Sequence, residues 1–290
     1  MILKEGQEMN SRGNHKIKKY ISKFLVYAIL IVFVCLAIYP LLWMIGASLK
    51  LPSEVMASYK LWPEEPQWQT YVKVWQDLNF FKYFFNSFII TVAAVVAINI
   101  VYAMAGFAIA KLRFAGKKLV FLVFMGMMFV PGVTMLIPIY LTLNALNLLD
   151  THLGMILVFI NGAAPFAIFL YRNYFTTIPH EIYESARVDG ASPFRTLFSI
   201  YFPLGVPAMA TITTMNVISI WNNLSLPLVV LNSKELQTLP IAIVNLDKSA
   251  FRQWNVLMTG SLFAIIPVLI LFFFLQKYYI QGLTAGSVKE

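Results

Sequence analysis

Long apolar runs separated by short polar segments dominate the hydrophobicity pattern of the chain. Each run reaches the roughly 20 residues that an α-helix needs to cross the hydrocarbon core of a bilayer. The pattern therefore predicts an all-α, polytopic membrane protein with six transmembrane helices in one domain at 24–280, between a basic segment at 1–23 and a tail at 281–290. The six runs lie at about 24–48, 84–110, 119–143, 153–175, 204–231 and 256–276.

Two of the predicted spans contain residues that interrupt helices. The third carries Pro131 and Pro138, and the fourth carries Asn161-Gly162 and Pro165 near its middle. Proline removes a backbone hydrogen bond, and inside a membrane such a break persists where protein or a cavity covers it. Kinked helices around a central cavity suit a transporter, although plastic helix packing would explain the same residues.

Composition and charge support a membrane protein with a defined orientation. Only 12% of the residues are charged, against about 25% in soluble domains. With six spans both termini lie on one side, and 15 of the 22 Lys and Arg residues fall on that side. Positively charged loops stay in the cytoplasm, so we expect a multi-pass protein with cytoplasmic N- and C-termini. The net charge of +9 is then a signal of topology, and it gives no reason to expect nucleic-acid binding.

Groups that commonly perform catalysis or hold metals are scarce. The single cysteine, Cys35, lies in an apolar run, and His15, His152 and His180 are not at ligand spacing. No Gly-x-x-x-x-Gly-Lys-Ser/Thr phosphate-binding loop occurs. We therefore expect no catalytic residues, no metal site and no cofactor in this chain.

One polar segment, residues 177–203, separates the fourth and fifth apolar runs. Pro179 suits the first turn of a helix, and Gly190 suits a helix end that needs positive φ. Ser192-Pro193 then reads as an N-cap followed by proline at the first helical position. The sequence predicts a short helix, a sharp turn and a second short helix leading into the fifth span, near Pro203.

This segment has the chemistry of a docking element that faces water. Small residues would let a partner's surface approach, whereas Glu184, Arg187 and Asp189 could orient it, and two rigid helices joined to spans could transmit its movement. The alternative is an ordinary connector. The residues expected to couple to a partner are Glu184, Ser185, Ala186, Asp189, Gly190 and Ala191.

The same segment resembles the loop by which permease subunits of ATP-binding-cassette importers dock onto their ATPases. That family has Glu-Ala-Ala, three residues, Gly, nine residues and Ile-x-Leu-Pro. Here Glu184, Ala186, Gly190, Ile200 and Pro203 are in register, with Ser185 and Phe202 as mild departures. The stretches Ser48-Leu49-Lys50, Asn86-Ser87, Ile137-Pro138-Ile139-Tyr140 and Gln281–Lys289 also resemble the six-span permeases for carbohydrates.

The resemblance implies a subunit that is not itself an enzyme, in a bacterial cytoplasmic (inner) membrane. Its partners would be a second permease subunit, favoured to be a paralogue, two ATPase subunits that bind ATP and Mg²⁺, and an extracytoplasmic solute-binding protein. The substrate would be a sugar, with an oligosaccharide favoured.

The fifth run holds the residues best suited to a sugar. Asparagine amides donate and accept hydrogen bonds, and tryptophan presents a flat apolar face. We expect Asn216, Trp221, Asn222 and Asn223 to contact the solute, although polar groups within spans also join helices together. Asn223 stands where similar carbohydrate permeases often have Glu, which leaves the solute open.

Two other functions compete with a sugar importer. One is an importer permease for a polyol, a glycerol phosphate or an amino acid, which the sequence separates poorly from sugar import. The other is an ATP-independent secondary transporter. Such proteins commonly place ionisable residues within their spans, and the apolar runs here have essentially none.

Overall fold

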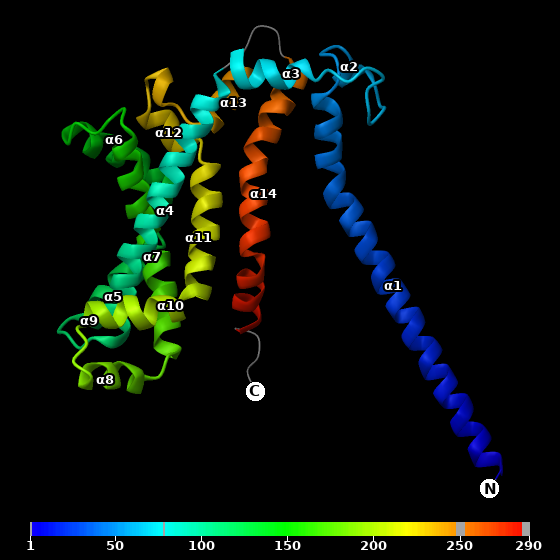
Figure 1. The fold of residues 1–290 in the computed structure, drawn as a ribbon, viewed down its shortest axis with the longest axis horizontal. Coiled ribbons are helices and arrows are strands. Elements are labelled where there is room, and N and C mark those ends of the chain that lie inside the picture. The colour runs from blue at the N-terminus through cyan, green and yellow to red at the C-terminus, as the bar shows by residue number, and fades with distance from the viewer. Residues whose placement is uncertain (1, 78, 248–252, 286–290) are drawn as a thin grey trace. The chain divides into compact units, whose positions relative to one another are not determined.

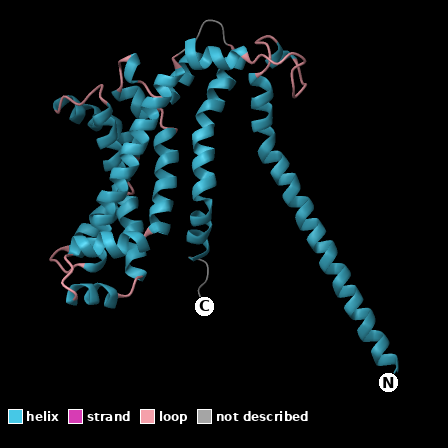
Figure 2. Ribbon diagram, viewed as in Figure 1, coloured by secondary structure: helices cyan, strands magenta, loops and turns pink. Residues whose placement is uncertain are grey.

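The computed structural model describes residues 2–77, 79–247 and 253–285. Within these ranges the chain forms helices, turns and loops and contains no strand (Figure 2). The all-α prediction is confirmed. The tail predicted at 281–290 lies outside the described residues from 286 onward, and the segment predicted at 1–23 is part of the first helix from Ile2.

Eighteen helical elements are described, most of them α-helices. They are α1 (Ile2–Ser48), α2 (Glu54–Ala57), α3 (Gln69–Val72), η1 (Lys73–Asp77), α4 (Phe80–Lys111), α5 (Lys117–Met127), η2 (Gly132–Met135), α6 (Leu136–Ala145), α7 (His152–Thr177), α8 (His180–Val188), α9 (Pro193–Thr196), η3 (Leu197–Tyr201), α10 (Phe202–Leu204), α11 (Val206–Trp221), α12 (Ser225–Val230), η4 (Lys234–Leu236), α13 (Leu239–Asp247) and α14 (Trp254–Ala285).

Four of these helices are long and apolar enough to cross a membrane without interruption. The four spans are Tyr20–Ser48, Phe80–Lys111, His152–Thr177 and Trp254–Phe274. Two further pairs qualify only as broken spans: Lys117–Met127 with Gly132–Ala145, bent by 97°, and Pro193–Leu204 with Val206–Trp221, bent by 77°. The described residues thus contain four continuous spans, or up to six if each bent pair is one span.

Two predictions about individual spans were wrong. The break expected at Asn161-Gly162 and Pro165 is absent, because α7 is helical throughout. Proline removes only one backbone hydrogen bond of the helix. Pro165 is buried, so packing of α7 against its neighbours can compensate for that loss. The fifth run was expected to be one span over 204–231, but α11 ends at Trp221 and a separate helix, α12, follows.

The chain divides into two compact units, described separately. The first comprises the described residues up to Thr70 together with Gln253–Thr259. In it, the loop after α1 is fixed by Lys50, a buried lysine whose Nζ donates to the carbonyl oxygens of Lys60 (2.6 Å) and Ser58 (3.2 Å). The backbone N–H of Gln67 also donates to the carbonyl oxygen of Leu49 at 2.8 Å. Burial of an ammonium group requires such partners.

The second unit comprises the described residues of Tyr71–Arg252 and Gly260–Glu290, and α4, α7 and α11 form its core (Figure 1). α4 and α7 approach closely at Gly106, which lies against Tyr171. A buried polar network joins all three helices. The hydroxyl of Tyr171 donates to Asn99 Oδ1 at 2.7 Å, and Asn99 Nδ2 donates to Thr213 Oγ1 at 3.1 Å.

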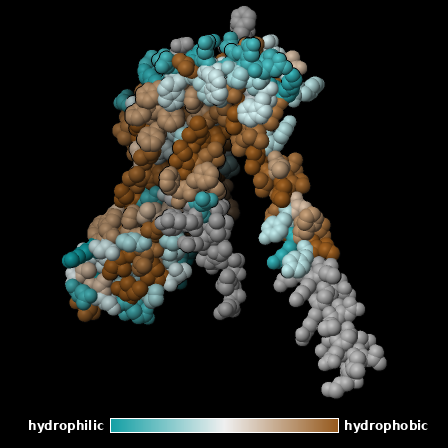
Figure 3. Space-filling model, turned by 45° about the vertical axis from the view of Figure 1, so that its right-hand side comes forward, coloured by the Kyte–Doolittle hydropathy of each residue, from teal (hydrophilic) through white to brown (hydrophobic). Residues whose placement is uncertain are grey.

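The beginning of α4 is held by the segment between α12 and α13. The side-chain amide of Asn86 donates to the carbonyl oxygens of Glu235 and Gln237, both at 2.9 Å. The hydroxyl of Ser87 accepts the N–H of Leu239 at 2.8 Å. Figure 3 shows hydrophobic side chains over the middle of the helices and hydrophilic ones gathered toward their ends, as expected of membrane spans.

Candidate functional site: the coupling element

The helices of the polar segment lie at one end of the second unit, opposite α12 and α13 (Figure 1). We call residues 178–204, which include α8, α9, η3 and α10, the coupling element. α8 carries Glu181 in its first turn and Arg187 in its last, an arrangement that the helix dipole favours. His180 Nε2 lies 3.7 Å from a carboxylate oxygen of Glu184 one turn later, on the exposed side of the helix.

A glycine turn ends α8. The backbone N–H of Gly190 donates to the carbonyl oxygen of Arg187 at 3.1 Å, and that of Ala191 donates to Ala186 at 2.9 Å. This pair of bonds is a Schellman motif, which requires a left-handed residue after the helix. Gly190 supplies it with φ +77°. The predicted helix end at Asp189–Gly190 is confirmed.

The second helix begins as its sequence predicted. The Oγ of Ser192 accepts the N–H of Arg195 at 3.2 Å, and Pro193 occupies the first turn. The chain then stays helical through η3 and α10 to Leu204, and it bends by 77° into α11 after Gly205. The coupling element is therefore two short helices at a sharp turn, continuous in sequence with α7 and α11.

Most of the expected coupling residues lie on the exposed side of this element. Glu184, Ser185, Asp189 and Gly190 are exposed, and Ala191 is half-buried. Ala186 differs, since only 6% of it is exposed and its side chain is buried within the protein. Beside the charged residues the element exposes large apolar side chains, with Val188 87% exposed and Phe194 62% exposed. Charged and apolar groups together on a water-facing loop are the composition of a protein-docking surface.

The inner side of the coupling element packs against the end of α4 through aromatic rings. The ring centroid of Phe107 lies 6.0 Å from Tyr183 in α8, 5.0 Å from Tyr201 in η3 and 6.4 Å from Phe175 in α7. Edge-to-face packing of this kind adds stability beyond area burial. Both helices of the element are thus fixed to the transmembrane core.

The residues expected to contact a sugar are placed differently from one another. Trp221 is 3% exposed, its indole N–H donates to the carbonyl oxygen of Ala264 at 2.9 Å, and its ring packs edge-to-face on Phe84. The Oδ1 of Asn223 accepts the N–H of Leu226, in the first turn of α12, at 3.1 Å. The Trp221 side chain therefore joins the end of α11 to α14, whereas the Asn223 side chain makes a local bond at the start of α12.

The other two asparagines are more accessible. Asn222 is exposed and Asn216 is half-buried, and the amide of each donates to a carbonyl oxygen one turn earlier in its own helix, Ile218 and Ile212. Among the described residues no partner is seen for their side-chain oxygens, which lie on α11 and just beyond its end. Of the four predicted residues, Asn222 is the one best exposed for contact with a solute.

Comparison with known families identifies the family to which the chain belongs. The model of the family described as "Binding-protein-dependent transport system inner membrane component" matches residues 103–285, which include the whole coupling element. The chain belongs to this family. Its members are permease subunits and not enzymes.

Individual relatives of the family resemble the chain along most of its length. The arabinooligosaccharides transport system permease protein AraQ of Bacillus subtilis (strain 168) is 34% identical over 258 residues, 88% of this chain and 91% of that protein. The diacetylchitobiose uptake system permease protein NgcG of Streptomyces coelicolor is 30% identical over 264 residues, 91% of this chain and 86% of that protein. A solved bacterial ABC transporter involved in the import of the acidic polysaccharide alginate has a chain 27% identical in sequence with a TM-score of 0.78, covering 89% of this chain and 96% of that one.

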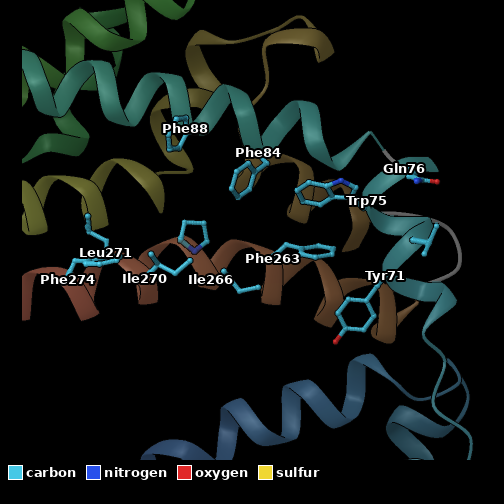
Figure 4. A pocket seen from close by; sticks show the side chains of 12 residues that line it. Tyr71, Trp75, Gln76, Phe84, Phe88, Phe263, Ile266, Ile270, Leu271 and Phe274 are labelled. Carbon is cyan, nitrogen blue, oxygen red and sulfur yellow. The ribbon is translucent and has the colours of Figure 1, made fainter.

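The permease also has an apolar groove between η1, α4 and α14, with a volume of about 780 Å³ (Figure 4). Trp75, Phe84 and Phe263 surround one part of it, and Ile270 and Phe274 lie farther along α14. None of the four residues predicted to contact a sugar lines this groove. Its walls are almost entirely apolar, and the few hydrogen-bonding groups among the lining residues belong to Tyr71, Trp75 and Gln76.

Sequence reasoning missed two features of the permease. The buried network of Asn99, Tyr171 and Thr213 joins three helices, but single polar residues far apart in sequence gave no pattern. Lys111 was counted with the basic residues that set topology, and the structure buries it. A helical period was the available signal, since Ala103, Phe107 and Lys111 recur at four-residue spacing on one face.

Proposed function

We propose that this permease forms half of the translocation pathway of a bacterial importer of oligosaccharides. Its named relatives support the substrate class, since they transport arabinooligosaccharides, diacetylchitobiose, or melibiose, raffinose and stachyose. The absence of ionisable residues between Pro203 and Lys234 favours an uncharged sugar. Relatives with these substrates favour sugar import over a polyol, a glycerol phosphate or an amino acid.

The coupling element carries the mechanistic part of the proposal. Its exposed charged and apolar side chains would dock onto an ATPase subunit in the cytoplasm, with the termini on the same side of the membrane. ATP and Mg²⁺ bind in the two ATPases, and closure of that pair would displace α8 and α9. Because the element is continuous with α7 and α11, its displacement would switch the pathway from inward- to outward-facing. An extracytoplasmic binding protein then delivers the sugar.

The remaining partner is a second permease subunit, which we propose to be a paralogue. The two subunits would enclose the solute between them, with Asn222 and Asn216 of this chain offering amide groups. Trp221 would act indirectly, by joining α11 to α14, and Asn223 by fixing the first turn of α12.

Purification of the intact complex tests this function. The chain is co-expressed with a candidate ATPase, second permease and binding protein from the same organism, and ATPase activity is measured in proteoliposomes with candidate oligosaccharides. We expect the sugar-loaded binding protein to stimulate ATP hydrolysis and uptake of that sugar. Uptake by the chain alone without ATP would contradict the proposal.

A charge reversal on the coupling element tests its docking role. Glu184→Lys should weaken co-purification of the ATPase and lower stimulated hydrolysis, because Glu184 lies on the exposed side of α8. Glu64→Lys is the control, since Glu64 is an equally charged, exposed residue outside the coupling element. If equal amounts of ATPase co-purify with Glu184→Lys and with the wild type, Glu184 is not part of the docking surface.

A further inference from the structure

Lys111 ends α4, and it is buried although its side chain carries a charge. Only 5% of it is exposed, and it lies one turn beyond Phe107 on the helix face that packs against the coupling element. An ammonium group loses its hydration when buried, so it is retained only with compensating partners. These partners show what the residue does.

The ammonium group lies at both junctions of the coupling element. Its Nζ donates to the carbonyl oxygen of Ile178 at 2.5 Å, and Ile178 is the residue between α7 and Pro179. This carbonyl belongs to a helix C-terminus, which favours a cation. The same Nζ lies over the ring of Tyr201 in η3, 5.5 Å from its centroid, in cation–π contact. One side chain thus contacts the segments that lead into α8 and out of α9.

A role in membrane topology alone does not explain this placement. Lys111, Arg113, Lys117 and Lys118 form one basic segment, in which Arg113 and Lys118 are exposed. Lys117 donates to the carbonyl oxygen of Leu112 at 3.0 Å, just beyond the end of α4. A positive charge that only orients the protein works from the exposed positions, and it needs neither burial nor these contacts.

We propose that Lys111 is a positioning residue that locks the coupling element to α4. With the Ile178 carbonyl held by the ammonium group, a displacement of α8 reaches α4. Without it, the displacement is absorbed by bending between Ile178 and Pro179, because the contacts that remain, the rings around Phe107 and the apolar side chains beside them, carry no directed bond to the Ile178 carbonyl. This inference rests on the proposed function of the coupling element as the docking site for an ATPase.

Three variants in the intact importer test the proposal. Lys111→Met removes the charge and keeps the chain length, Lys111→Arg keeps a cation, and Lys118→Met removes an equal charge from an exposed position. The measurement is the amount of sugar taken up per ATP hydrolysed in proteoliposomes. We expect Lys111→Met to lower this ratio about fivefold or more, the size of a typical coupling between two sites. Lys111→Arg should restore most of it, and Lys118→Met should leave it unchanged.

A distance measurement separates positioning from a general loss of folding. Spin labels are placed at exposed Val188 in α8 and exposed Val101 in α4, with the lone Cys35 replaced by Ala. The distance distribution should be broad in Lys111→Met and as narrow in Lys111→Arg as in the parent protein.

The outcomes identify which idea fails. A wild-type ratio and a narrow distribution in Lys111→Met would overturn the positioning role, and so would an equal loss in Lys118→Met, which would mean that net charge alone matters. A wild-type complex whose ATPase ignores every sugar would contradict the proposed function instead. The spin-label distances would still decide whether Lys111 holds α8.

Discussion

Gly106 on α4 lies directly against Tyr171 on α7. A Cβ atom built at Gly106 would lie 2.4 Å from the Tyr171 Cβ and 2.9 Å from the backbone nitrogen of Arg172. Close approach of two helix backbones needs such a small residue. The contact sets the distance between the two helices at the core of the permease, in the same turns that carry Phe107 and Tyr171.

Gly106→Ala should therefore destabilise the permease. The added methyl group forces the helices apart, which we expect to cost about 1–3 kcal/mol, the usual range for overpacking. Gly126→Ala in α5 is the matched control, because nothing lies within 4 Å of its Cβ position. The thermal unfolding midpoint of the purified protein in detergent measures both. Equal midpoints for the two variants would show that the helices separate without cost.

Gly190→Ala should lower the sugar-stimulated ATPase activity. The loss should exceed the effect of local backbone strain, because the turn also sets the angle between α8 and α9. Gly190 has φ +77°, where an L-residue is strained by about 1 kcal/mol, and it sets the angle between α8 and α9. Gly116 offers a matched control, with φ +78°, similarly open space and a place outside the coupling element. Stimulated ATPase activity should fall in Gly190→Ala and stay near the wild-type level in Gly116→Ala. Equal activities in the two variants would contradict the role of the turn.

Substitutions at Trp221 and Asn222 should separate packing from solute contact. Trp221→Phe loses the hydrogen bond to the Ala264 carbonyl, and we expect it to cost about 1 kcal/mol of stability. Asn222→Ala removes an exposed amide and should leave stability unchanged while it lowers uptake of the sugar. Thermal unfolding and initial uptake rates are measured for both. Unchanged uptake and sugar affinity in Asn222→Ala would show that Asn222 does not contact the solute and that this part of the chain contributes only to packing.

Acid should weaken the connection between residues 150 and 233. The hydroxyl of Ser233 donates to the carboxylate of Asp150, and the N–H groups of Ser233 and Asn232 donate to it at 3.0 and 2.9 Å. These bonds, the hydroxyl first, hold the pKa of Asp150 below its usual range. Because the folded pKa is lowered, this stabilisation is complete above the unfolded pKa of about 3.9 and is lost as pH falls through the folded pKa.

Asp150→Asn tests this connection, since it removes the carboxylate while keeping a residue that tolerates φ +56°. The unfolding midpoint is followed from about pH 7 to about pH 3. The variant should be less stable than wild type at neutral pH, and the difference should shrink on acidification. A difference that stays constant with pH would contradict a contribution from the ionised carboxylate.

Features set by local chemistry could be predicted from the sequence. The turn of the coupling element depends on Gly190, Ser192 and Pro193, whose preferences act within a few residues, and the structure reproduces it. Apolar runs likewise identified where the helices lie. The expected roles of the exposed coupling residues stay predictions, since they depend on partners.

Features set by distant neighbours could not be predicted. Trp221 carries an aromatic face suited to a sugar, but the Ala264 carbonyl 43 residues later engages its indole. The proline that should interrupt α7 lies within an unbroken helix, because packing against other spans compensates for one lost hydrogen bond. The end of α11 at Trp221 is a different case, since the Oδ1 of Asn223 accepts the N–H of Leu226 in the first turn of α12, a local hydrogen bond that hydropathy does not register.

The hydrogen bonds that fix the beginning of α4 also constrain the order in which the chain can fold during synthesis. Asn86 and Ser87 bind backbone groups 149 to 152 residues further along the sequence. At a synthesis rate of about 5–20 residues per second, roughly 7 to 30 seconds pass before those groups exist. During that interval the Asn86 amide and the Ser87 hydroxyl are without these native partners. The native position of the first turns of α4 can therefore be fixed only after the segment that follows α12 has been translated.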